Sequence, residues 1–86
     1  MKEYRLKIRE LREDSDYTQS YIASILSIGQ RTYADYELGK TRIPVESLIR
    51  LAKLYNVDMN YICGISEKKS MFPQNYSVPA NGTNKK

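Results

Sequence analysis

Apolar side chains in the middle of the chain recur at helical spacing. Ile22 and Leu26 are four positions apart, and Tyr33 and Tyr36 are three apart, so each pair lies on one side of a helix. The two pairs are separated by a short polar stretch that breaks the period. The pattern predicts two short helices joined by a tight turn, over residues 19–26 and 30–38.

Residues that cap or pack helices occur where this prediction needs them. Thr18 is a good N-cap for the first helix, and Gly39 can supply the left-handed residue that commonly ends the second. Gly29 is the expected cap of the second helix, and Ile28 beside it would anchor the turn to the core. Ala23 is small enough to let a second helix backbone approach the first closely. Together these residues predict a helix-turn-helix.

The flanking sequence predicts three more helices, so we expect an all-α domain of five helices. The first would span 4–14, with Tyr4, Ile8 and Leu11 facing inward. The fourth would start around Pro44, which suits a first helical turn, and end near Tyr55. Its predicted inward positions are Val45, Leu48, Leu51, Ala52 and Tyr55. A short fifth helix would span 59–63, capped by Asp58 and closed by Gly64.

From Ser66 onward the composition changes. This stretch has two of the three prolines, scattered polar residues and no apolar period. We therefore expect a helix-turn-helix domain over 1–65 and a flexible C-terminal tail over 66–86.

The central motif resembles the helix-turn-helix of the Cro/lambda-repressor (Xre) family of bacterial and phage regulators. The likeness spans roughly residues 8 to 64 and rests on Thr18-Gln19, Ile22-Ala23, Leu26, Ile28, Thr32, Tyr36-Glu37, Gly39-Lys40, Ile43-Pro44-Val45-Glu46-Ser47-Leu48, Leu51-Ala52, Tyr55-Asn56-Val57 and Tyr61-Ile62-Cys63-Gly64. It implies a compact lambda-repressor-like domain and a sequence-specific regulator of transcription, a repressor of its own or a neighbouring promoter.

The turn departs from the family pattern, which has Gly in the turn and Ser or Thr at the following cap. Here the order is Ser27-Ile28-Gly29. A left-handed conformation at Ser27 would cost on the order of 1 kcal/mol.

The resemblance implies base contacts from the outward face of the second motif helix, near its N-terminus. Gln30 can bond adenine and Arg31 can bond guanine, each through two hydrogen bonds. Asp35 could accept from cytosine N4, and Ala34 could touch a thymine methyl group. In an arbitrary amphipathic helix the same four residues would be ordinary solvated side chains. Phosphate contacts are expected from Gln19, Thr32, Lys40, Thr41 and Arg42.

Two further expectations follow from the family. Arg12 would form a partly buried ion pair with Glu37, which ties the first helix to the recognition helix. The family also pairs two subunits on a near-palindromic operator, with half-sites about 34 Å apart. The candidate dimer residues are Met59, Tyr61, Ile62 and Ile65, with Met71 and Phe72 beyond them; the same residues could instead close the core.

Composition limits other functions. The net charge is +4 over 86 residues, but residues 64–86 hold four lysines and one glutamate, so most of the excess lies there. The chain has no histidine and one cysteine, Cys63, which speaks against catalysis, a metal site or a cofactor. No apolar run approaches the roughly 20 residues that span a membrane. We expect a cytoplasmic protein that is not an enzyme.

A second class of function stays open at this stage. An antitoxin would bind DNA through the same domain and a toxin through its tail, where Met71, Phe72 and Tyr76 are apolar or aromatic. A controller protein of a restriction-modification system would share the fold. The sequence therefore leaves room for a protein partner beside double-stranded DNA.

Overall fold

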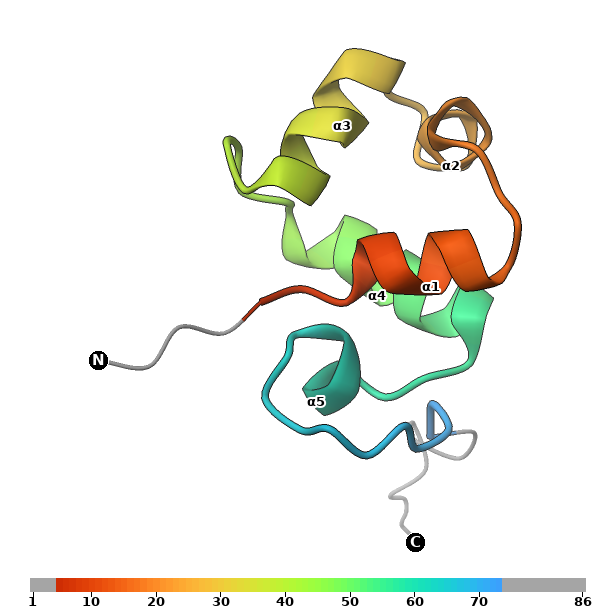
Figure 1. The fold of residues 1–86 in the computed structure, drawn as a ribbon, viewed down its shortest axis with the longest axis vertical. Helices are drawn as coiled ribbons and strands as arrows, with labels where there is room; N and C mark the ends of the chain where they lie inside the picture. Colours follow the sequence, from red (N-terminus) through yellow and green to blue (C-terminus); the bar gives the residue numbers. More distant parts are fainter. Residues whose placement is uncertain (1–4, 74–86) are drawn as a thin grey trace, which may run out of the picture.

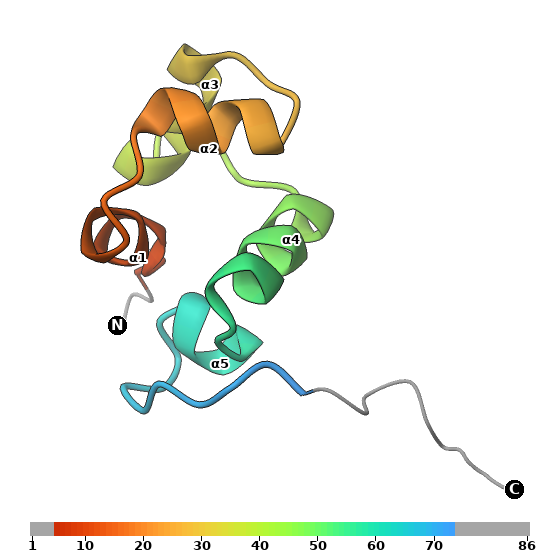
Figure 2. The same ribbon diagram turned by 90° about the vertical axis from the view of Figure 1, so that its right-hand side faces the viewer.

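The computed structural model describes residues 5–73, which form five helices and no strand (Figure 1). In chain order these are α1 (Ile8–Asp14), α2 (Gln19–Ile25), α3 (Gln30–Leu38), α4 (Val45–Tyr55) and α5 (Met59–Ile62). The helices α2 and α3 lie together at one end of the molecule, α1 and α4 cross its middle, and α5 lies at the opposite end (Figures 1 and 2). The prediction of an all-α five-helix domain is confirmed.

The helix-turn-helix forms as its caps predict. The Thr18 hydroxyl accepts a hydrogen bond from the Tyr21 N–H at 3.0 Å, which satisfies one free donor at the start of α2. Gly39 ends α3 in the left-handed conformation, with φ of 79°. Ser27 is left-handed as well, with φ of 60°, whereas Gly29 caps α3 from an extended conformation. The unusual order of residues in the turn therefore places the left-handed strain on a serine.

One apolar core joins the described helices. Ile22 and Ala23 of α2 and Tyr33 and Tyr36 of α3 are buried in it. The remaining buried members come from α1, the α2 C-cap, α4, α5 and the α4–α5 turn, namely Ile8, Leu11, Leu26, Leu48, Leu51, Ala52, Val57 and Ile62. No helix within residues 5–73 combines the length and apolarity that a membrane crossing requires.

Val45 corrects the predicted inward face of α4, because its side chain is 63% exposed. It is the first residue of the helix, and Pro44 before it is the N-cap. The buried stripe begins one turn later, at Leu48. The apolar period therefore identified the helix correctly but extended its buried face by one residue too many.

The first helix starts at Ile8, later than predicted, because the residues before it pack against the α5 end of the domain. The Lys7 N–H donates to the Ile62 carbonyl at 2.9 Å. The Arg5 backbone passes Gly64 so closely that a Cβ on Gly64 would meet the Arg5 carbonyl oxygen at 2.0 Å. The Lys7 N–H is thereby bonded outside the helix, and the chain before it does not continue α1. Tyr4, predicted to face inward, lies outside the described residues.

Residues 66–73 also depart from the prediction, since they lie along the domain under α5 (Figure 2). The Asp58 N–H donates to the Ser70 carbonyl at 2.8 Å, and Phe72 is half-buried with the Lys53 ammonium 5.7 Å from its ring centroid. Glu67 pairs with Lys7 at 3.3 Å. We call residues 66–73 the C-terminal strap. The rest of the predicted tail, 74–86, lies outside the described residues.

Candidate nucleic-acid interface

The helix α3 presents two sides of opposite character. Tyr33 is fully buried and Tyr36 nearly so, which fixes the inward side. Gln30 and Arg31 are exposed in the first turn, and Ala34 and Asp35 follow as half-exposed residues in the next turn. The four residues expected to contact bases therefore occupy the first two turns of one helix. They form a contiguous surface of three polar side chains around one methyl group, of the size and chemistry that a major groove admits, and we call these four residues the reading surface.

The N-terminus of α3 is open. Gly29 contributes no side-chain hydrogen bond to the first turn, so the early N–H groups of the helix have no capping partner from that residue. Thr32 is exposed in the same turn. The free N–H groups and the positive end of the helix dipole favour an anion in front of this turn. A phosphate of a DNA backbone is such an anion.

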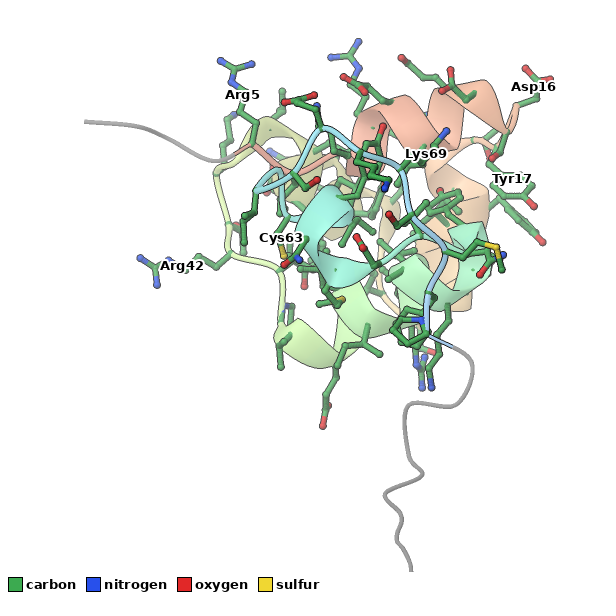
Figure 3. All side chains as sticks on the ribbon, turned by 90° about the horizontal axis from the view of Figure 1, so that it is seen from below. Arg5, Asp16, Tyr17, Arg42, Cys63 and Lys69 are labelled. Carbon is green, nitrogen blue, oxygen red and sulfur yellow. The ribbon has the colours of Figure 1, made fainter. Side chains whose placement is uncertain are left out.

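The loop after α3 holds three candidate phosphate contacts in a fixed geometry. The N–H groups of Lys40 and Thr41 both donate to the Asp35 carbonyl, at 2.9 and 3.4 Å. The side chains of Lys40, Thr41 and Arg42 are exposed, and Arg42 projects away from the domain (Figure 3). These two hydrogen bonds tie the start of the loop to the second turn of α3.

Arg12 and Glu37 form the expected link between α1 and α3. Arg12 Nε donates to Glu37 Oε2 at 2.7 Å and Arg12 Nη2 to Glu37 Oε1 at 3.2 Å, so the pair is bidentate. Only 13% of the Arg12 side chain and 2% of the Glu37 side chain are exposed. Arg12 Nη1 also donates to the Tyr17 carbonyl at 3.0 Å, which holds the segment between α1 and α2.

Gln19, expected at a phosphate, has a second role that sequence reasoning missed. Its Nε2 donates to Glu37 Oε1 at 3.0 Å, so the first residue of α2 is tied to the end of α3. One hydrogen of this Nε2 remains for another acceptor. The sequence holds no local signal of this bond, because the two residues are 18 positions apart.

The electrostatics of this buried group are mutual. Burial by itself would raise the pKa of Glu37, but the hydrogen bonds from Arg12 and Gln19 outweigh burial and the net pKa is lowered. The hydrogen bond to Glu37 raises the pKa of Arg12. Both groups are therefore charged at neutral pH, and the negative charge of Glu37 is neutralised by Arg12 inside the domain. It therefore reduces the positive potential around the exposed Arg31, Lys40 and Arg42 only slightly.

The candidate dimer residues are placed unequally. Ile65 is 58% exposed, whereas Met59 and Tyr61 are half-buried. Ile62 corrects the prediction, because its side chain is 0% exposed and belongs to the core. Tyr61 is covered in part by two lysines, with Lys7 Nζ 5.7 Å and Lys69 Nζ 5.9 Å from its ring centroid.

Cys63 is half-buried near α5 (Figure 3), and burial raises the pKa of its thiol, which disfavours the reactive thiolate. Among residues 5–73, no three His, Cys, Asp or Glu side chains come together as a group that could hold a metal ion.

Known proteins share this motif and its surroundings. The helix-turn-helix family profile matches residues 8–62, which is more than half of the chain. The HTH-type transcriptional regulator AnsR of Bacillus subtilis is 34% identical over 68 residues, 79% of this chain and 59% of that protein. The cryptic phage CTXphi transcriptional repressor RstR of Vibrio cholerae is 36% identical over 61 residues, 71% of this chain and 55% of that protein.

A third relative, the HTH-type transcriptional regulator ImmR of Bacillus subtilis, is 33% identical over 61 residues, 71% of this chain and 48% of its own length. The chain thus spans about half to three-fifths of the length of these curated relatives. No solved structure matches it significantly.

Proposed function

Because the chain belongs to the Cro/C1-type helix-turn-helix family, we propose that it is a sequence-specific double-stranded DNA-binding regulator of transcription, acting as a repressor of its own or a neighbouring promoter. Its relatives are named as transcriptional regulators, and one of them as a phage repressor. The recognition helix is α3, which lies in the major groove.

The observation that carries this proposal is the combination of an open α3 N-terminus with exposed polar side chains just behind it. Gln30 and Arg31 can each make two hydrogen bonds to a purine, and Ala34 and Asp35 extend the reading surface by one turn. Exposed Thr32, Lys40, Thr41 and Arg42 would contact phosphates on either side of the groove, with Gln19 at the start of α2. The Arg12–Glu37 pair fixes α3 for this purpose.

We further propose that two subunits bind a near-palindromic operator, because one recognition helix of nine residues reads only part of a turn of DNA. Ile65, exposed at the α5 end of the domain, is the central candidate for the dimer contact, with Met59 and Tyr61 at its margin. Sedimentation at high micromolar concentration, with and without operator DNA, tests this point. A protein that stays monomeric under both conditions would contradict it.

The test of DNA reading is fluorescence anisotropy with a duplex taken from upstream of the protein's own gene and with a scrambled duplex, at several salt concentrations. Arg31→Ala removes two hydrogen bonds to one base, so affinity for the native duplex should fall by about 5- to 150-fold. Lys40→Ala should weaken both duplexes alike and lower the salt slope by about one.

Arg9→Ala is the matched control, because Arg9 is an exposed arginine on α1 whose partner is Glu13. It should leave the affinity for the native duplex unchanged. If the wild-type protein binds neither the native duplex nor any sequence selected from a random pool better than scrambled DNA, the proposal of sequence-specific binding is wrong.

A further inference from the structure

Leu38 is an apolar side chain left in solvent on the helix that carries the reading surface. It is 63% exposed, although Tyr33 and Tyr36 of the same helix are buried. The end of α3 is firmly held, since Gly39 closes it in the left-handed conformation and the Lys40 N–H bonds the Asp35 carbonyl at 2.9 Å. Leu38 is therefore exposed on an ordered helix, and packing in the core does not account for a leucine at this position.

Helix geometry places Leu38 on the same face as Arg31. Seven residues at 100° each bring it to within about 20° of Arg31 around the axis, at a rise of about 10.5 Å. Asp35 lies between them on that face, and the tyrosines lie opposite. Zinc-finger helices read three successive bases with residues spread over a similar length of helix. A helix lying along the groove can thus bring Leu38 to a base about 10.5 Å further along the groove than the base that Arg31 contacts.

The chemistry of this position is narrow. A leucine side chain has no hydrogen-bonding group, so it cannot read a donor or acceptor. The one apolar group that a base pair offers in the major groove is the C5-methyl of thymine. We propose that Leu38 selects thymine at one position of each half-site by packing against that methyl group. This inference rests on the proposed function and adds a specificity residue that makes no polar contact.

The experiment replaces each thymine of the selected operator by uracil, one at a time, which removes the methyl group and leaves every hydrogen-bonding group in place. Dissociation constants are measured by anisotropy for the wild type, Leu38→Ala and Leu38→Met. At one position per half-site the wild type should lose about fourfold, the value for one buried methyl-sized group. Leu38→Ala should show no loss there, and Leu38→Met should show it again.

Leu54→Ala is the matched control, because Leu54 is an exposed leucine at the C-terminal end of α4; it should keep the wild-type uracil profile. A methyl group read by Ala34 would stay sensitive in Leu38→Ala, so the two contacts separate. If Leu38→Ala has the same uracil profile as the wild type, the inference is overturned while the proposed function stands. If the wild type shows no preference for any DNA sequence, both are overturned.

Discussion

Replacing Arg12 by alanine should remove most of the protein's free energy of unfolding. Glu37 would keep its carboxylate in a site where 2% of the side chain is exposed, and the hydrogen bond left to it would be the one from Gln19 Nε2. Removing one partner of a buried pair costs about 3–5 kcal/mol, because the other charge stays buried without compensation. A domain of this size has a total stability near the low end of about 5–15 kcal/mol.

The assay is thermal and urea unfolding followed by circular dichroism. For domains of 60–100 residues each kcal/mol moves Tm by about 4–8 °C, so Arg12→Ala should lower Tm by more than about 12 °C. Arg9→Ala is the matched change on the same helix. The Arg9–Glu13 pair is an i,i+4 pair with side chains 64% and 52% exposed, and its loss should cost at most about 0.5 kcal/mol.

Equal Tm values for Arg12→Ala and Arg9→Ala would refute the reasoning, because they would mean that the bidentate contact is not maintained in solution. A second variant isolates the charge. Glu37→Gln keeps the shape of the side chain and leaves Arg12 with a neutral partner, so it should be destabilising by less than Arg12→Ala. The order of the three variants, and not only their signs, follows from the burial of the two groups.

Three further predictions concern the backbone and acid stability. Gly64→Ala should destabilise strongly, because its Cβ would lie 2.0 Å from the Arg5 carbonyl oxygen at a φ of +82°; Gly29→Ala, with nothing within 4 Å, should cost less than about 1 kcal/mol in the same unfolding assay. Ser27→Gly should raise the unfolding free energy by on the order of 1 kcal/mol by relieving the left-handed conformation, and a loss of stability would contradict this. The pKa of Glu37 is lowered from its ordinary 4.5, so the folded state binds that proton more weakly: its stabilisation is complete above about pH 4.5 and is lost as pH falls through the folded pKa. Urea unfolding from pH 7 to 3 should show this acid loss, and Glu37→Gln should flatten it.

The motif was predictable because its information is local. The bounds of α3 follow from Gly29 and Gly39, and Thr18 marks the start of α2, since each cap acts within one turn of its own helix. The spacing of Tyr33 and Tyr36 places the reading surface, because it sets which side of α3 is buried. The order Ser27-Ile28-Gly29 predicts backbone strain at Ser27 for the same local reason, and Ser27 is left-handed in the structure.

What could not be predicted depends on contacts between distant parts of the chain. The start of α1 is decided by Lys7 and Arg5 lying against the α5 end, more than fifty residues away. The C-terminal strap is held by Asp58 and Lys53, although its own composition is that of a loop. The role of Gln19 toward Glu37 appears only when α2 and α3 are packed.

The pairing of the two described ends has a consequence for the order in which the chain folds. The α2–α3 unit is built from neighbours in sequence, whereas the Lys7–Ile62 and Lys7–Glu67 contacts close a loop of about sixty residues, Lys7 and Glu67 being 60 positions apart. Loop closure of that length is costly until most other contacts exist. We therefore expect the contacts of Lys7 with Ile62 and Glu67 to form last. On the ribosome, the first described residues would stay unengaged until the α5 segment has emerged.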